Sequence, residues 1–252
     1  MSRSPATAII LAAGRGSRLR PLTDHTPKPL VRAGGQPLIG WGLRLLAAHG
    51  IRDVVINVHH LRERIMEELG DGSAFGVHIR YSIEEELLDT GGGIVQAAGC
   101  AGVLPDGPPL LVMNADVVTD VPLDTLLRAH EQGGGGISLV LREDPRAADY
   151  GLFGIDEHNR IRRFLGRGAP PDGLREYMFA SVQVLSPAVL DRMPKAGAFS
   201  TMHGVYPGLF DAGLPFHGFV HSGRWHTSDT AEDLRELEKS LQTLGKPGLP
   251  GD

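Results

Sequence analysis

The chain has 252 residues, a length that suits one large domain or one domain with an appended lobe. Its composition, with 41% hydrophobic and 22% charged residues, is typical of a globular protein. Its formal net charge of -5 argues against general nucleic-acid binding, because a surface that follows a phosphate backbone needs an excess of basic residues. Cys100 is the only cysteine, which excludes an internal disulfide and favours a reducing, cytoplasmic environment. No run approaches the roughly 20 apolar residues that span a bilayer, so we expect no membrane partner.

The first predicted element is a buried strand over residues 6–13. The loop behind it cannot be regular, because it contains Gly14, Gly16 and three prolines between positions 21 and 29. Its charged residues are Arg15, Arg18, Arg20, Asp24 and Lys28. A glycine loop that leaves a strand can turn its backbone N–H groups toward one point, and arginine and lysine side chains add positive charge for phosphate oxygens. The loop therefore predicts a polyphosphate site, although it lacks the G-K-[ST] of a P-loop.

Helical and strand patterns alternate through the first half of the chain. Helices are predicted over residues 37–49, 61–69, 90–98 and 122–131, and strands over residues 53–58, 77–83, 110–113 and 137–141. This alternation predicts right-handed βαβ units. We therefore expect an α/β fold, with a Rossmann-like, mostly parallel sheet flanked by helices.

The pattern changes after Tyr150. Residues 152–155 and 161–164 predict a hairpin, and they are followed by a strand over 178–185, a short helix over 187–193 and an amphipathic helix over 229–242. This half has α+β character and is predicted to form a smaller lobe. We expect one domain over residues 1–245, with halves at 1–142 and 143–245, and a frayed tail over 246–252.

Three acidic positions are candidates for chemistry. Asp116 follows the apolar strand L-L-V-M-N, so it is predicted at the carboxyl end of a central strand, where it could hold Mg²⁺ or simply form a turn. Glu84 opens the phrase E-E-E-L-L-D-T-G-G-G, whose glycines begin a helix. Asp229 stands three residues before Glu232, a spacing that also suits a helix N-cap with its capping-box partner.

The opening phrase L-A-A-G-x-G-x-R-L-x-P-L-T, followed by T-P-K-P-L, resembles the signature of the sugar-1-phosphate nucleotidylyltransferases. The resemblance implies a single domain of the nucleotide-diphospho-sugar transferase type, whose first half binds the nucleotide and whose second half binds the sugar phosphate. It implies that Arg18 steadies the pyrophosphate and that Lys28 neutralises charge at the reacting phosphates, both as catalytic residues. The loop residues implied to bind the nucleotide are Leu11, Ala12, Ala13, Gly14 and Gly16.

Two further phrases extend this resemblance. L-L-V-M-N-A-D-V-V is similar to the family's strand that ends in an aspartate, which implies that Asp116 is a ligand of Mg²⁺. The Glu84 phrase is similar to a segment that lines the base pocket, which implies that Glu84 faces the base with Asp89, Thr90 and Gly91 beside it. Because glutamate only accepts hydrogen bonds, the two adjacent donors of guanine favour GTP, while UTP stays open.

The second half departs from the family pattern. Tyr150 and Gly151 resemble the family's Y-G segment, which implies that Gly151 meets the sugar. After Phe164 the family's E-K-P is absent, and Arg167 is the cation left for the sugar phosphate. The phrase W-H-T-S-D-T resembles W-x-D-x-G-T, in which the aspartate is the second metal ligand. Thr227 takes its place here, so Asp229 is the remaining candidate for the metal.

The resemblance implies a reaction in which a sugar 1-phosphate attacks the α-phosphorus of a nucleoside triphosphate and pyrophosphate leaves, with Mg²⁺ as cofactor. The phrases T-P-K-P-L, G-Q-P-L-I and T-G-G-G are most similar to mannose-1-phosphate guanylyltransferases and N-acetylmuramate-1-phosphate uridylyltransferases. A non-catalytic, nucleotide-sugar-binding regulatory homologue is the alternative of another class, because Thr227 and the lost acid could mark such a protein. The sugar, the base and the formation of a homodimer stay open.

Overall fold

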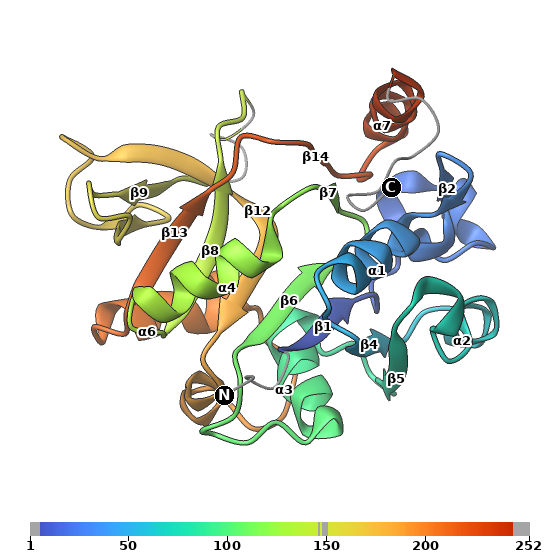
Figure 1. The fold of residues 1–252 in the computed structure, drawn as a ribbon, viewed down its shortest axis with the longest axis horizontal. Helices are drawn as coiled ribbons and strands as arrows, with labels where there is room; N and C mark the ends of the chain where they lie inside the picture. The colour runs from blue at the N-terminus through green and yellow to red at the C-terminus, as the bar shows by residue number, and fades with distance from the viewer. Residues whose placement is uncertain (1–5, 146, 148–150, 244–252) are drawn as a thin grey trace.

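The computed structural model describes residues 6–145, 147 and 151–243 as an α/β structure (Figure 1). Its α-helices are α1 (Leu38–Ala48), α2 (Arg62–Leu69), α3 (Asp89–Ala101), α4 (Leu123–Gln132), α6 (Tyr206–Asp211) and α7 (Ala231–Thr243), and a π-helical turn over Thr201–Val205 leads into α6. The short helix predicted over residues 187–193 is a 3-10 helix over Pro187–Arg192. Its longer strands are β1 (Thr7–Leu11), β4 (Asp53–Val58), β5 (His78–Ile83), β6 (Leu110–Asn114), β8 (Ile137–Arg142), β9 (Phe153–Ile155), β10 (Ile161–Phe164), β12 (Arg175–Leu185) and β13 (Phe216–Val220). Its two-residue strands are β2 (Arg32–Ala33), β3 (Gln36–Pro37), β7 (Val118–Thr119), β11 (Arg167–Gly168) and β14 (Trp225–His226).

One ten-stranded sheet organises the molecule. Its main path runs β11-β10-β9-β12-β6-β1-β4-β5, and β8 pairs with β12 and β13 beside that path. The four strands β6, β1, β4 and β5 are mutually parallel, whereas β12 is antiparallel to β6. The predicted mostly parallel sheet is therefore confirmed. It is also continuous across the boundary that we predict between the two halves, because β12 joins β6 to β9.

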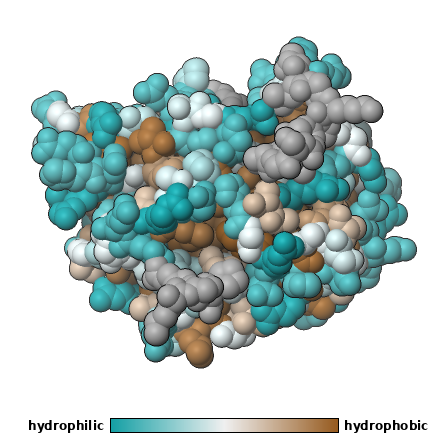
Figure 2. All heavy atoms as spheres, in the orientation of Figure 1, coloured by the Kyte–Doolittle hydropathy of each residue, from teal (hydrophilic) through white to brown (hydrophobic). Residues whose placement is uncertain are grey.

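Helices cover both faces of this sheet. Along β1, Ala8 and Ile10 point to one face, where they belong to a buried cluster with side chains of α1, α2 and α4. Ile9 points to the other face and belongs to a cluster with α3 and α6. Because β1 is buried on both sides, it reads as a continuous apolar run rather than an alternating one. Hydrophilic residues cover much of the face shown in Figure 2, and apolar residues lie among them and in its hollows.

The strand order creates the place for a ligand. The chain passes from β1 to β4 and β5 on one side and then returns through α3 to β6 on the other side of β1. Open α/β sheets bind ligands outside the carboxyl ends of the strands at such a reversal. The end of β1 is therefore the position from which the candidate site is built.

The second half agrees with the prediction in part. The hairpin formed by β9 and β10 is confirmed, and β11 extends it. We did not predict α6, β13 or the two-residue strands. The last helix begins at Ala231, and its buried side chains Leu237 and Leu241 pack against Val31 and Leu38 near the amino end of the chain. The tail predicted to be frayed, residues 246–252, lies outside the described residues.

Within the part of the chain that the structure describes, no helix combines the length and hydropathy needed to cross a bilayer.

Candidate active site

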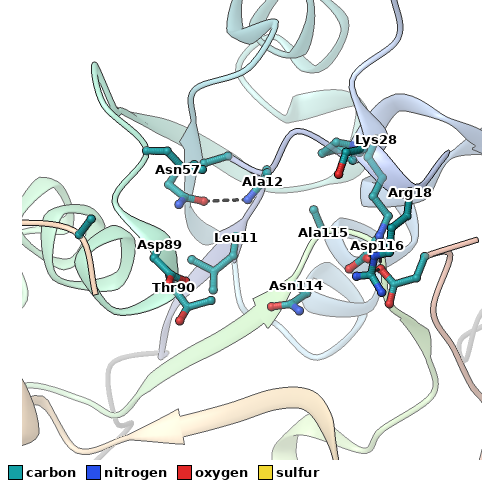
Figure 3. A pocket seen from close by; sticks show the side chains of 18 residues that line it. Leu11, Ala12, Arg18, Lys28, Asn57, Asp89, Thr90, Asn114, Ala115 and Asp116 are labelled. Atoms are coloured by element: carbon teal, nitrogen blue, oxygen red, sulfur yellow. Dashed lines mark hydrogen bonds and ion pairs between the residues drawn. The ribbon is translucent and has the colours of Figure 1, made fainter. Parts of the chain in front are cut away.

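A cavity of about 610 Å³ opens at the carboxyl ends of β1, β4 and β6 (Figure 3). It brings together most of the residues that the sequence singles out. Its lining is formed by Leu11, Ala12, Ala13, Gly14, Gly16, Ser17, Arg18, Lys28, Pro29, Asn57, Leu87, Asp89, Thr90, Asn114, Ala115, Asp116, Ala198 and Asp229. Segments from the first and the last quarter of the sequence therefore share one cleft.

The glycine loop follows directly from β1. At Gly14 an added Cβ would meet no atom within 4 Å, so the backbone there faces open space. Gly16 has φ +62°, a conformation that favours glycine, and a Cβ at this position would lie 2.9 Å from the Cβ of Lys28. The buried Thr23 hydroxyl donates to the Gly16 carbonyl at 2.8 Å. These contacts fold the loop back so that Lys28 lies beside Gly16.

One end of the cleft is strongly charged. Lys28 Nζ donates to Asp229 Oδ1 at 2.7 Å and also to Asp116 Oδ2, while Arg18 Nη2 donates to the same Asp229 oxygen at 2.9 Å. The side chains of Lys28, Asp116 and Asp229 are only 14–16% exposed, whereas that of Arg18 is 66% exposed. Burial alone would lower the pKa of Lys28, but the two carboxylate charges and their hydrogen bonds outweigh it and raise this pKa. Lys28 is therefore held as a cation.

Asp229 reaches this end because another residue caps the last helix. Thr230 Oγ1 accepts from the Asp233 backbone N–H at 3.1 Å, and the Asp233 carboxylate accepts from both the backbone N–H and the hydroxyl of Thr230 at 2.8 Å. The capping box is therefore formed by Thr230 and Asp233. The alternative that Asp229 and Glu232 form it, one residue earlier, is wrong. Thr227, which replaces the family's aspartate, is buried and does not line the cleft.

The donor set at the charged end fits a magnesium ion. Among the described residues, no three His, Cys, Asp or Glu side chains form a cluster that could hold a metal. Asp116 and Asp229 nevertheless both contact the ammonium group of Lys28, so their oxygens lie within reach of one common cation. Mg²⁺ typically takes one or two protein carboxylates and completes its octahedron with phosphate oxygens and water. The two aspartates meet this requirement when a polyphosphate is present.

The opposite end of the cleft is built from Leu11, Asn57, Asp89 and Thr90 (Figure 3). Glu84 does not line it. This side chain is 1% exposed, and its two oxygens accept from Asn57 Nδ2 at 2.7 Å and from the Leu88 backbone N–H at 2.9 Å. The structure therefore places Glu84 behind the cleft wall, where it binds protein groups. The direct contact with the base that the resemblance implies stays a prediction.

Gly91 also lies outside the lining. Its backbone N–H donates to the Phe199 carbonyl at 2.8 Å, and an added Cβ would come within 2.4 Å of the Phe199 ring. Thr90 Oγ1, which does line the cleft, accepts from the Thr201 backbone N–H at 3.0 Å. The glycines at the start of α3 thus let the helix approach the segment around residues 197–201, in addition to any approach by a ligand.

The two residues assigned to the sugar phosphate are not brought to this cleft. Arg167 is exposed and donates from Nη1 to Asp211 Oδ2 at 3.0 Å. Gly151 has φ +89°, and a Cβ there would lie 2.5 Å from the Leu165 side chain. Tyr150 lies outside the described residues. The roles of Gly151 and Arg167 in sugar binding stay predictions.

The structure adds two residues that we did not single out from the sequence. Asn57 and Asn114 are the polar residues near the carboxyl ends of β4 and β6, and both pair in register with Leu11 at the end of β1. Asn57 Oδ1 accepts from the Ala12 backbone N–H at 2.7 Å. The sequence feature that could have identified both residues is a single amide side chain near the end of each apolar strand, at the edge of the sheet where ligands bind.

Comparison with known proteins places these features in context. A family model described as nucleotidyl transferase matches residues 7–236. The N-acetylmuramate alpha-1-phosphate uridylyltransferase of Neisseria meningitidis serogroup B is 38% identical over 234 residues, which cover 92% of this chain and 96% of that protein. The mannose-1-phosphate guanylyltransferase of Mycobacterium tuberculosis is 34% identical over 237 residues, with 93% and 64% coverage. The UTP–glucose-1-phosphate uridylyltransferase of Synechocystis is 30% identical over 257 residues, with 96% and 66% coverage.

The chain thus spans just under two thirds of the last two relatives and nearly all of the Neisseria protein. Solved structures resemble it in fold. HddC from Yersinia pseudotuberculosis, complexed with GMP-PN, superposes with a TM-score of 0.77 at 19% identity, covering 94% of this chain and 99% of that one. A putative glucose-1-phosphate thymidylyltransferase from Bacillus anthracis, in complex with a sucrose, gives 0.78 at 19% identity, with 94% and 96% coverage.

Proposed function

Because the chain belongs to the nucleotidyl transferase family, we propose that it joins the nucleotidyl group of a nucleoside triphosphate to a sugar 1-phosphate. A phosphate oxygen of the sugar 1-phosphate attacks the α-phosphorus and forms the new P–O bond. The bond between the α-phosphorus and the oxygen that bridges to the β-phosphorus breaks, and that oxygen leaves with pyrophosphate. The products are a nucleoside-diphosphate sugar and pyrophosphate.

The observation that carries this proposal is the meeting of two cations and two carboxylates at one end of the cleft, next to a glycine loop. Arg18 and Lys28 supply positive charge beside Asp116 and Asp229, and the backbone at Gly14 faces the open cleft. Phosphoryl and nucleotidyl transfer require positioning and charge neutralisation more than covalent work by the protein. An arrangement of fixed cations around an anion-binding loop supports that chemistry.

Each residue then has a distinct task. The backbone of Leu11, Ala12, Ala13, Gly14 and Gly16 holds the nucleotide. Arg18, whose side chain is largely exposed, stabilises the leaving pyrophosphate. Lys28, which is mostly buried, neutralises charge at the reacting phosphates. Asp116 and Asp229 hold Mg²⁺, which supplies additional neutralisation of the phosphate oxygens when bound.

Two substrate pairs are candidates. GTP with mannose 1-phosphate is the first candidate, because the sequence phrases are similar to those of mannose-1-phosphate guanylyltransferases and the Mycobacterium relative carries that name. UTP with N-acetylmuramate 1-phosphate is the second candidate, and one observation favours it: the Neisseria relative matches this chain over 96% of its own length. A regulatory homologue without activity is less well supported, because Asp229 supplies the carboxylate that Thr227 lacks.

The direct experiment measures pyrophosphate release with Mg²⁺. GTP and UTP are each combined with mannose 1-phosphate, N-acetylmuramate 1-phosphate and glucose 1-phosphate. The proposal expects release with at least one pair, only when both substrates are present, and its loss when EDTA removes the metal or when Asp116 is replaced in Asp116→Asn. Nucleotide binding without release from any pair would contradict the transferase and favour the regulatory homologue.

A further inference from the structure

We propose that Asn57, supported by Glu84, is a positioning residue that locks the nucleoside end of the cleft in its binding conformation. The inference rests on the proposed function, since it concerns the site of the nucleoside triphosphate. The two side chains come from different strands, Asn57 from β4 and Glu84 from the residue after β5. Together they connect the glycine loop to the segment of residues 84–90 on the other side of the cleft.

The connection is a chain of three short hydrogen bonds. The Ala12 backbone N–H donates to Asn57 Oδ1 at 2.7 Å, and Asn57 Nδ2 donates to Glu84 Oε1 at 2.7 Å. The second oxygen of Glu84 accepts from the Leu88 backbone N–H at 2.9 Å. Asn57 is 3% exposed and Glu84 is 1% exposed, so solvent cannot replace these bonds easily.

The chain of bonds has a direction that fixes the chemistry of both residues. Asn57 must accept from Ala12 and donate to Glu84, which an amide does and a carboxylate cannot. Glu84 must accept twice, from Asn57 and from Leu88. Gly93 leaves the space for both, because a Cβ at that position would lie 2.6 Å from Asn57 Nδ2 and 2.8 Å from Glu84 Oε1. Any side chain on Gly93 would therefore collide with the pair.

These hydrogen bonds lie at the end of the cleft that would hold the nucleoside, not at the end that would hold the phosphates. Figure 3 shows Asn57 and Ala12 together with Asp89 and Thr90, away from Lys28, Arg18 and Asp116. Leu87, Asp89 and Thr90 belong to the segment that Glu84 holds, and they line the cleft directly. Loosening these bonds should therefore weaken the hold on the base and ribose while leaving the charged end able to bind a polyphosphate.

The test exchanges the two functional groups. In Asn57→Asp, the new carboxylate cannot donate to Glu84, so the bond between these two side chains is lost. In Glu84→Gln, the new NH₂ group faces either the Asn57 amide or the Leu88 N–H, both of which are donors, so one of the two bonds at position 84 is lost. The double variant Asn57→Asp with Glu84→Gln restores all three, because the new amide at position 84 donates to the new carboxylate at position 57 and accepts from Leu88. It also keeps the net charge of the wild type. Binding of GTP, UTP and inorganic tripolyphosphate is measured by calorimetry with Mg²⁺ for all four proteins.

Each single variant should bind the preferred nucleotide at least about tenfold more weakly, the scale for losing a hydrogen bond to a charged group. Its affinity for tripolyphosphate should stay within about threefold of wild type, and the double variant should recover nucleotide affinity. If Asn57→Asp does not fold, the milder Glu84→Gln and the double variant decide. Equal losses for nucleotide and tripolyphosphate, single variants that bind like wild type, or no recovery in the double variant would overturn the inference.

The binding data, read together with the pyrophosphate-release assay, separate this inference from the proposed function. A wild type that binds a nucleotide but releases no pyrophosphate refutes the transferase, while the binding data still judge the role of Asn57. A wild type that releases pyrophosphate but shows no selective loss in the single variants refutes the role of Asn57 alone. A wild type that binds neither nucleotide refutes both.

Discussion

Lys28 is the residue at which the charges of the cleft meet. It donates to Asp116 and Asp229, the two aspartates proposed to hold the metal, and its side chain lines the cavity while being only 14% exposed. Buried ion pairs gain little stability by themselves, because desolvation opposes the attraction between the charges. The arrangement is therefore better explained by function than by stability. Two experiments at single positions follow from it.

The variant Lys28→Ala should fold and should lower turnover by about 10²–10³, the usual cost of removing one preorganised group that stabilises charge. The reason is that no other described lysine lines the cleft. Steady-state kinetics with saturating substrates measure the change. Lys195→Ala is the matched control, since Lys195 lies at an exposed site bound to Asp191, and its turnover should equal that of wild type. Turnover of Lys28→Ala within about threefold of wild type would remove Lys28 from the mechanism.

The ammonium group of Lys28 should also compete with divalent cations for the two carboxylates. In Lys28→Met the aspartates lose that counter-charge, so Mn²⁺ should bind at least about tenfold more tightly without nucleotide, as expected from losing one charge-assisted bond. Electron paramagnetic resonance of free Mn²⁺ reports the affinity without any turnover. Adding Asp116→Asn should cancel the gain. Unchanged Mn²⁺ affinity in Lys28→Met would show that the aspartates do not form the metal site.

At the scale of elements, two glycines of α3 have different surroundings. At Gly92 an added Cβ would lie 2.4 Å from the Gly197 carbonyl oxygen, a backbone atom that cannot rotate away. At Gly99, on the same helix, an added Cβ would meet nothing within 4 Å. The first glycine therefore serves the contact between α3 and the segment before the π-helical turn, and the second does not.

Alanine substitutions at these two positions should have opposite effects on stability. Gly92→Ala should lower the free energy of unfolding by about 1–3 kcal/mol, because the extra methyl overpacks the contact. Gly99→Ala should raise it by up to about 1 kcal/mol, because alanine is the better helix former. Urea unfolding followed by circular dichroism measures both. A stabilised Gly92→Ala protein would show that α3 does not pack closely on that segment.

The predictability of elements followed the strength of their patterns. The strands β1, β4 and β6 are apolar runs between turn residues, and they were predicted because buried parallel strands have that composition. By contrast, β13 contains His217 and Gly218, so its own sequence is a weak strand signal. Its parallel pairing with β8 stabilises it as a strand. The helix α6 has a proline in its first turn and contains Gly208, which weakened its signal although proline is acceptable in a first turn.

Predictability within the site followed a similar rule. The glycine loop, Arg18, Lys28 and Asp116 were found because they form one long phrase and a strand end that resemble a known family, and the family is confirmed. Asn57 was missed, because its importance comes from the register that sets it beside Leu11 and Ala12. The position of Asp229 depends on which residue caps α7, and the sequence offers two adjacent capping boxes of similar quality, between which only the folded structure decides.

At the scale of the whole molecule, His130 links the packing of α4 to acid stability. Its Nδ1 lies 2.9 Å from Ser138 Oγ and its Nε2 lies 3.0 Å from Ser186 Oγ, at a site that is 1% exposed. Burial, with a smaller effect of His217, lowers the pKa of His130 from 6.5 to about 4. Between these two pH values the unfolded chain binds a proton there that the folded chain does not.

The free energy of unfolding should therefore fall as the pH drops from about 6.5 to about 4, by roughly 2–4 kcal/mol from this histidine alone. Urea unfolding at a series of pH values measures the effect. Since carboxylates contribute to acid unfolding as well, the informative quantity is the difference between wild type and His130→Gln, which should show a flatter profile. His158→Gln, at an exposed position, should retain the wild-type slope. Equal slopes in wild type and His130→Gln would contradict the assignment.

The central claim is that the glycine loop and the cluster of Arg18, Lys28, Asp116 and Asp229 bind one nucleoside triphosphate with its metal. A crystal structure with a non-hydrolysable triphosphate and Mg²⁺ tests it most directly. The account predicts phosphates along residues 14–18, Mg²⁺ between Asp116 and Asp229, Lys28 turned toward the phosphates, and the base beside Asn57. A nucleotide bound elsewhere, or Asp116 and Asp229 still closed on Lys28 with no metal between them, would contradict it.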